Sequence, residues 1–226
     1  MTRLLASALL VSTILVPPAF AASPMAELEQ ALSHDGLQKV KVKGLDVVFA
    51  RPGATLAGYG KVKLEPVDVA FRKDWDPERT GSRLKLRAED REKIRSGVAK
   101  IVHDEFAKEL QTRGSYKVVG EAGPDVLRVN VHIVNLYVTA PDTNEAGRSR
   151  TYTVSAGEMT LFMELYDSET GEVLARIVDH QEARGAMGRL SFSNSVMNAG
   201  EAQLIASNWA RVLRNALDKA HGIGKK

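Results

Sequence analysis

The spacing of apolar residues switches between two periods along this chain, and this switching is the strongest constraint on its fold. From residue 127 to residue 133, apolar side chains alternate with polar ones, which predicts a strand with one buried face. In segments 88–113 and 201–220 the apolar residues recur every three or four positions, which predicts two long helices. Shorter strand patterns lie at 45–49, 59–71, 116–119, 152–166 and 172–180. The order predicts an α+β fold, a mostly antiparallel sheet with both helices packed on one face.

Three local signals refine this prediction. Pro66 interrupts the pattern of 59–71, which indicates an edge strand or a bulge there. The apolar phase changes after Ile133, so we expect a β-bulge near residues 133–135. Residues 167–171, which begin with Asp and end with Gly, are typical of a hairpin turn. Trp209 shares the apolar stripe of the second helix with Ile205, and we expect it in the core.

The N-terminal residues have the pattern of a secretory signal peptide. A basic start at Arg3 precedes an apolar run over 4–16, and Ala19-Phe20-Ala21 matches a signal-peptidase site. The run is too short for a stable membrane span, although an uncleaved anchor or a buried N-terminal helix are alternatives. We therefore expect cleavage after Ala21 and a periplasmic protein, with secretion from the cell as the alternative. The predicted division is 1–21 signal peptide, 22–43 N-terminal extension and 44–226 a single α+β domain.

Composition excludes several classes of chemistry. The 226 residues contain no cysteine, which excludes disulfides, thiolate nucleophiles and thiolate metal sites. The five histidines lack metal-ligand spacing, and no phosphate-binding loop, dinucleotide fingerprint or nucleophile elbow occurs. A net charge of +3 is small for this length and gives no indication of nucleic-acid binding. We expect no cofactor, no metal and no transmembrane segment, and a binding function is favoured over an enzymatic one.

Two clusters are candidate binding residues. Trp75 lies beside Arg72 and Lys73 in a polar segment, and a tryptophan ringed by charges is typical of a contact anchor. The alternative is that Trp75 folds back over the core while the charged residues face water. A second cluster that could receive an acidic partner comprises Arg148, Arg150 and Tyr152.

Two further groups could support catalysis. Glu158 and Glu164 share one face of the predicted strand, and paired carboxylates can perform acid–base chemistry in a dry cleft. His132 and His180 lie on polar strand faces and could be neighbours in the sheet. A solvated sheet face is the simpler interpretation of both pairs.

Several blocks of the sequence resemble one bacterial family. The blocks are 51–53, 66–75, 123–129, 149–158 and 167–171, and they include Arg51-Pro52-Gly53 and Asp167-Ser168-Glu169-Thr170-Gly171. Taken together and in this order, they resemble the exported proteins grouped as domain of unknown function 3313. Many members of that family look like lipoproteins with a cysteine after the signal peptide, which this chain lacks. The resemblance implies an envelope location and brings no established activity or functional residues.

These observations favour a non-catalytic periplasmic module that binds an envelope protein or polymer. The alternatives are a hydrolase of an envelope polymer that uses paired carboxylates, and a secreted factor.

Overall fold

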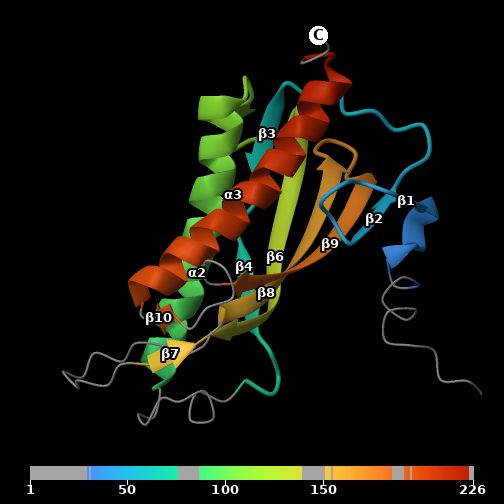
Figure 1. Ribbon diagram of the computed structural model, residues 1–226. Helices are drawn as coiled ribbons and strands as arrows, with labels where there is room; N and C mark the ends of the chain where they lie inside the picture. The colour runs from blue at the N-terminus through green and yellow to red at the C-terminus, as the bar shows by residue number, and fades with distance from the viewer. Residues whose placement is uncertain are drawn as a thin grey trace, which may run out of the picture.

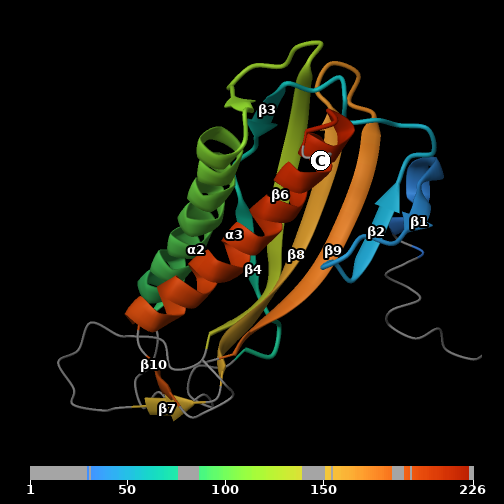
Figure 2. The same cartoon turned by 45° about the horizontal axis from the view of Figure 1, so that its top comes forward.

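Eight strands form one mixed sheet, and two long helices lie side by side across one of its faces (Figures 1 and 2). The computed structural model describes residues 30, 32–75, 87–138, 151–153, 155–184, 191–193 and 195–223. The helices are α2 (Ala88–Lys108) and α3 (Ser195–Ala220). The predicted α+β class, with a mostly antiparallel sheet, is confirmed. None of the described helices is long and apolar enough to cross a membrane.

The strands of the main sheet follow the order β1-β2-β9-β8-β6-β3-β5, and β4 also pairs with β6. Their bounds are β1 (Gln38–Val40), β2 (Val47–Ala50), β3 (Lys61–Leu64), β4 (Asp68–Phe71), β5 (Lys117–Val118), β6 (Val126–Val138), β8 (Ser155–Asp167) and β9 (Val173–Arg184). A separate antiparallel pair consists of β7 (Thr151–Thr153) and β10 (Ser191–Ser193). Short helical turns are η1 (His34–Gly36) and η2 (Glu109–Arg113), the latter a π-helical end of α2.

Part of the sheet is parallel, which the sequence analysis did not predict. Strands β3 and β4 both run parallel to β6 along the same edge, and β5 runs parallel to β3. Parallel strands need a long crossover, and α2 supplies it because it lies between β4 and β6 in the chain. Pro66 falls between β3 and β4, so the proline that was expected at an edge strand or a bulge instead separates two strands that pair with β6.

The main core lies between the sheet and the two helices. The inward side chains of β6, from Leu127 to Ile133, are at most 2% exposed, and Trp209 of α3 is 2% exposed. The Trp209 indole Nε1 donates a hydrogen bond to Asp179 Oδ2 at 2.7 Å. The prediction that Trp209 belongs to the core is therefore confirmed.

A second, smaller core covers part of the opposite face of the sheet, which we call the outer face. Leu32 and Leu37 pack there against Val47, Phe49 and Val178. Part of the predicted N-terminal extension therefore packs on the sheet, and β1 joins it as a strand. The position at which the domain begins stays a prediction.

Arg176 fastens this N-terminal segment to the outer face. Its guanidinium donates hydrogen bonds to Asp35 Oδ2 at 2.7 Å and to the His34 carbonyl oxygen at 3.3 Å. The same guanidinium donates to Glu164 Oε1 at 2.9 Å. Because one arginine joins β9, β8 and the segment before β1, the segment is held by charge as well as by apolar contact.

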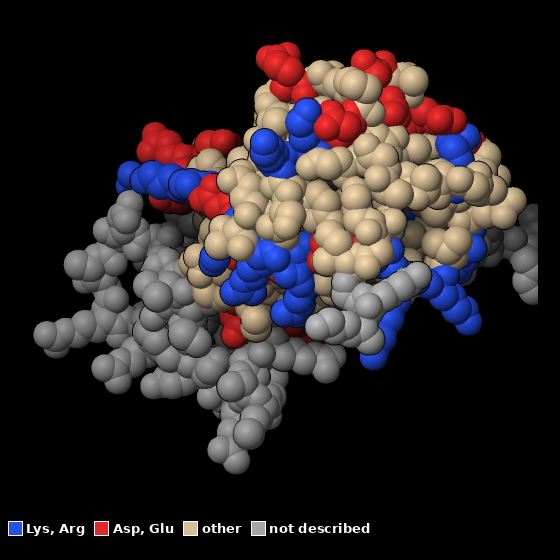
Figure 3. All heavy atoms as spheres, turned by 90° about the horizontal axis from the view of Figure 1, so that it is seen from above, with Lys and Arg blue, Asp and Glu red and all other residues tan. Residues whose placement is uncertain are grey.

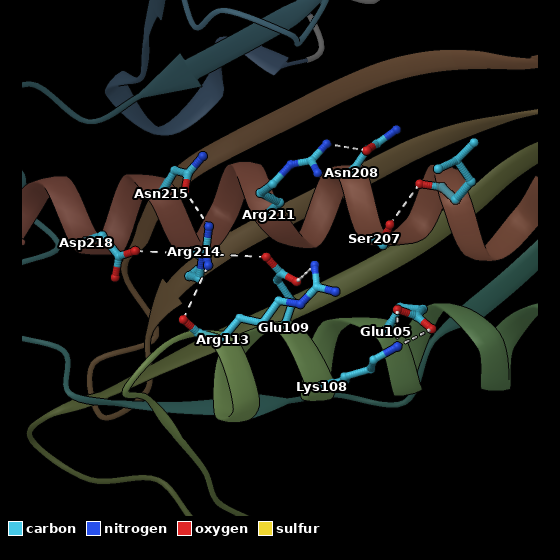
Figure 4. Close-up of polar contacts among 11 residues, drawn as sticks. Glu105, Lys108, Glu109, Arg113, Ser207, Asn208, Arg211, Arg214, Asn215 and Asp218 are labelled. Carbon is cyan, nitrogen blue, oxygen red and sulfur yellow. Dashed lines mark hydrogen bonds and ion pairs between the residues drawn. The ribbon is translucent and has the colours of Figure 1, made fainter. Parts of the chain in front are cut away.

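Polar side chains also join the ends of α2 and α3 (Figure 4). The Glu109 side chain is 4% exposed and lies 3.4 Å from Arg113 Nη1 and 3.6 Å from Arg214 Nε. Arg214 Nε lies 3.7 Å from Asp218 Oδ2, and Tyr116 Oη donates to Asp218 Oδ1 at 2.8 Å. Two arginines and one buried carboxylate thus hold this end of the helix pair together.

The predicted hairpin turn is confirmed. Asp167 Oδ1 accepts hydrogen bonds from the backbone N–H groups of Glu169 and Thr170, at 3.1 and 2.8 Å. The hydrogen bond from the Thr170 backbone is the largest cause of a lowered pKa for Asp167. Gly171 has φ 71°, a conformation that glycine adopts without strain.

The predicted bulge in β6 is also confirmed. The register between β6 and β8 shifts between Val134 and Tyr137, and Asn135 has φ 54°. Gly157 pairs with Val138 just beyond the shift and has φ 151°. A Cβ at Gly157 would lie 2.3 Å from the Tyr137 carbonyl oxygen. The two strands can approach this closely only because residue 157 has no side chain.

Replacing Gly157 with alanine should therefore destabilise the protein by on the order of 2 kcal/mol or more, through backbone strain and overlap. The free energy of unfolding from urea denaturation measures this change. Gly58→Ala is the matched control, since a Cβ there meets nothing within 4 Å, and its effect should stay within about 0.5 kcal/mol. Equal effects of the two substitutions would contradict the close approach at Gly157.

Candidate binding surface

A cluster of polar and aromatic side chains lies on the outer face of the sheet beyond the N-terminal segment. We call it the Arg72 cluster, and it consists of Arg72, Tyr137, Glu158, Thr160 and His180. Residues 137 and 158 face each other on β6 and β8, and residues 160 and 180 face each other on β8 and β9. Arg72 directly follows β4. Four segments of the chain, the residue after β4 and the strands β6, β8 and β9, thus contribute to one surface.

Arg72 is the centre of this cluster. Its guanidinium carbon lies 4.1 Å from the centroid of the Tyr137 ring, a cation–π contact. Its Nη1 pairs with Glu158 Oε1, and its Nε pairs with Asp74 Oδ1 at 2.6 Å. The Arg72 N–H donates to the Leu136 carbonyl oxygen at 3.0 Å, which anchors the backbone. The side chain nevertheless stays 34% exposed, so its guanidinium remains within reach of a partner.

Glu158 and His180 extend the cluster towards β9. His180 Nε2 lies 3.7 Å from Glu158 Oε2, and His180 Nδ1 lies 3.1 Å from Thr160 Oγ1. The His180 side chain is 50% exposed. This part of the cluster combines hydrogen-bond donors and acceptors with one imidazole that solvent reaches.

The β6 bulge places Tyr137 in the cluster. Before the bulge, odd-numbered residues of β6 point to the helices, as the buried Val131 and Ile133 do. The extra residue reverses this phase, so that Leu136 and Val138 are buried and Tyr137 lies on the outer face beneath Arg72. The sequence predicts the bulge but not the contact between Tyr137 and Arg72, because that contact depends on how β4 pairs with β6.

Trp75 is not an exposed anchor, and that part of the interpretation is wrong. Its side chain is 6% exposed and stacks on Phe71, with ring centroids 4.2 Å apart. Its Nε1 donates to the Val138 carbonyl oxygen at 3.0 Å. The backbone turns sharply here, since Trp75 N–H donates to the Arg72 carbonyl oxygen at 3.0 Å. This turn leaves Arg72 on the outer face and sends Trp75 into the core, as the alternative interpretation expected.

The other predicted binding residues are only partly placed. Lys73 is exposed at the turn between Arg72 and Trp75. Arg148 and Arg150 lie outside the described residues, and Tyr152 lies in β7 with its side chain outside the description. The proposed second cluster therefore stays a prediction.

The paired carboxylates do not form a catalytic pair. Glu158 and Glu164 lie on one face of β8 but six residues apart, which is roughly 20 Å along a strand. Glycosidases place their two carboxyl groups about 5–9.5 Å apart. Each glutamate is instead held by an arginine, Glu158 by Arg72 and Glu164 by Arg176. This arrangement suits a charged sheet surface better than a hydrolytic site.

The two histidines share the outer face but are not direct neighbours. His132 of β6 lies opposite Phe162 of β8, and the ring centroids are 5.8 Å apart. His180 of β9 lies opposite Thr160, which is also on β8. Strand β8 thus separates the two imidazoles. Within the described part of the chain, no group of three His, Asp or Glu side chains could hold a metal ion.

The charged groups are unevenly distributed around the molecule. In the view from above, many Asp and Glu side chains lie along the upper side of the picture, and Lys and Arg side chains lie both among them and towards the lower side (Figure 3).

We expect Trp75→Ala to lower the free energy of unfolding by about 3–5 kcal/mol, since it removes a buried ring and leaves the Val138 carbonyl without its donor. Chemical denaturation measures this loss. Lys73→Ala, at an exposed neighbouring position, should change stability by about 0.5 kcal/mol or less. An unchanged unfolding midpoint for Trp75→Ala would restore the exposed-anchor interpretation.

The solved structures that resemble this chain do so weakly, as two of them illustrate. The PelC dodecamer from Paraburkholderia phytofirmans is 13% identical over 74% of this chain and 96% of that chain, with a TM-score of 0.38. Protein XCC0632 from Xanthomonas campestris, described as DUF330, is 11% identical over 75% of this chain and 91% of that chain, with a TM-score of 0.44. At these scores neither resemblance assigns a function or an assembly to this chain.

No curated protein matches the sequence. A protein family does match it. A family match extends over residues 27–213, most of the chain, and includes every residue of the Arg72 cluster. The chain therefore belongs to the family described as "Protein of unknown function (DUF3313)".

Proposed function

We propose that this chain is an exported, non-catalytic binding module of the bacterial cell envelope, and that the Arg72 cluster is its binding surface. The observation that carries the proposal is the partly exposed Arg72 guanidinium, held over Tyr137 on the outer face of the sheet. Arginine and tyrosine are, with tryptophan, the residues enriched at binding hot spots.

The geometry of the carboxylates supports binding over hydrolysis. Glu158 and Glu164 are too far apart to act on one bond, and each forms an ion pair with an arginine. The rigid sheet beneath the cluster presents its side chains in a fixed arrangement, which reduces the entropy lost on binding. An envelope protein or polymer is the partner we propose.

The export part of this proposal rests on the signal-peptide pattern at residues 1–21. Expressed with its native start in a Gram-negative host, the precursor should be cut after Ala21, and the product should be recovered from the periplasmic fraction. N-terminal sequencing of that product should begin at Ala22. An exported product that still begins at Met1 would contradict cleavage, and a product confined to the cytoplasm would contradict export.

The binding part can be tested by capture from an envelope extract with immobilised mature protein. Arg72→Gln should abolish capture of the partner, because it removes the charge while keeping a polar side chain of similar length. Arg95→Gln is the matched control: Arg95 lies on α2, is 47% exposed and makes a comparable ion pair with Glu92. The free energy of unfolding of both variants should lie within about 0.5 kcal/mol of that of the parent protein. Equal capture by the two variants would exclude the Arg72 cluster as the binding surface.

A further inference from the structure

Four basic side chains occupy the outer face at the edge of the sheet where β6, β3 and β5 are neighbours (Figure 2). We call them the basic patch, and they are Lys61, Lys63, Lys117 and Arg128. The alternate residues Val62, Val118 and Leu127 pack in the main core, so the side chains between them point to the outer face. Arg128 and Tyr137 are nine residues apart on β6, roughly 25–30 Å along a strand, so the patch is separate from the Arg72 cluster.

Both cross-strand pairs of the basic patch join like charges. Lys63 lies opposite Arg128, and the other two lysines lie opposite each other. Like charges directly opposite each other destabilise a sheet. Asp125 Oδ1 lies 3.0 Å from Lys61 Nζ, and Glu65 Oε1 lies 3.1 Å from Lys63 Nζ. Four cations against these two carboxylates leave an excess of two positive charges, which attracts an anion.

Arg128 differs from the other arginines of the outer face. Arg72 and Arg176 each pair with a glutamate, whereas Arg128 forms no ion pair with another described residue. Glu164, which faces outward on the neighbouring strand, is held by Arg176. The guanidinium carbon of Arg128 lies 4.4 Å from the centroid of the Tyr166 ring, which fixes its orientation. Its Nε is buried and has no hydrogen-bond acceptor among the described residues. This guanidinium is therefore oriented by the protein without being neutralised by it.

We propose that Arg128 and Lys63 form a binding site for a phosphate group. A guanidinium binds two oxygens of a phosphate or a carboxylate at once. A carboxylate then has no further oxygen to offer, whereas a phosphate keeps another for the Lys63 ammonium. A phosphate monoester carries a charge of about −1.5 to −2 at neutral pH, which matches the excess charge of the patch. An oxygen that reaches Arg128 Nε would also supply the acceptor that this buried donor lacks.

The test uses the mature protein and inorganic phosphate at constant ionic strength. Two-dimensional NMR should show saturable shifts of the side-chain N–H of Arg128 and of the backbone amides of residues 61–64 and 126–130. Acetate should bind about tenfold more weakly or less, because its carboxylate leaves no oxygen for Lys63.

Arg128→Gln should raise the Kd for phosphate about tenfold or more, and Lys63→Gln should raise it about threefold. Arg128→Lys keeps the charge but loses the two-pronged contact, so its Kd should lie between those of the parent protein and Arg128→Gln. The matched control is Arg91→Gln on α2, which removes one positive charge from a guanidinium 5.7 Å from the Trp75 ring centroid. It should bind phosphate as the parent protein does. A thermal melt of each variant confirms that the fold is retained, and Lys63→Gln tests the site independently of the contact between Arg128 and the tyrosine ring.

Vesicles of phosphatidylcholine with and without phosphatidic acid distinguish two sources of the phosphate group. Sedimentation of the protein with phosphatidic acid vesicles, abolished by Arg128→Gln, would support a lipid headgroup. Binding of inorganic phosphate without binding to these vesicles would support a soluble phosphate ester.

Three outcomes would overturn the proposal. These are no saturable shift at Arg128 or Lys63, equal losses of phosphate binding in Arg128→Gln and Arg91→Gln, and acetate binding as tight as that of phosphate. None of these measurements involves Arg72, so failure here leaves the proposed binding surface at the Arg72 cluster intact.

Discussion

Strand β6 is the constraint on which the rest of the sheet depends. Strand β8 pairs along one side of it, and β3 and β4 share the other side. Its inward side chains from Leu127 to Ile133 are almost completely buried. A shift of register by one residue would expose all of them and bury Arg128 and His132 instead, so the apolar pattern permits a single register. The bulge at Asn135 is the one place where that register changes.

A buried carboxylate connects the sheet to the helix that covers it. Asp179 of β9 is 1% exposed and accepts hydrogen bonds from Trp209 Nε1, Gln181 Nε2 and the Asp46 backbone N–H. Moving a carboxylate out of water costs several kcal/mol, and hydrogen bonds to a charged group offset about 1.5–3 kcal/mol each. The three donors come from α3, from β9 itself and from the segment before β2. The contact therefore orients three elements, a specificity that apolar packing alone does not provide.

The candidate site could be predicted only in part. The sequence singled out the segment from Arg72 to Trp75 as a candidate binding segment, but it could not decide which of its residues faces water. A single turn sends Arg72 to the outer face and Trp75 to the core, and this depends on the pairing of β4 with β6. The contact between Tyr137 and Arg72 also depends on the pairing of β4 with β6. Glu158 and Glu164 were correctly assigned to one strand face, whereas their arginine partners lie on other segments and carry no local signal.

The sequence by itself determined the elements of local origin: both long helices, the alternating strands, the bulge after Ile133 and the turn at 167–171. Each depends on residues close together in the chain, through side-chain periodicity or backbone preference. Only the tertiary structure decided that β3 and β4 run parallel to β6, that β1 forms an edge, and that Arg72, Tyr137, Glu158 and His180 share one surface. These features depend on pairing between segments far apart in the chain, and local side-chain patterns are compatible with more than one such pairing.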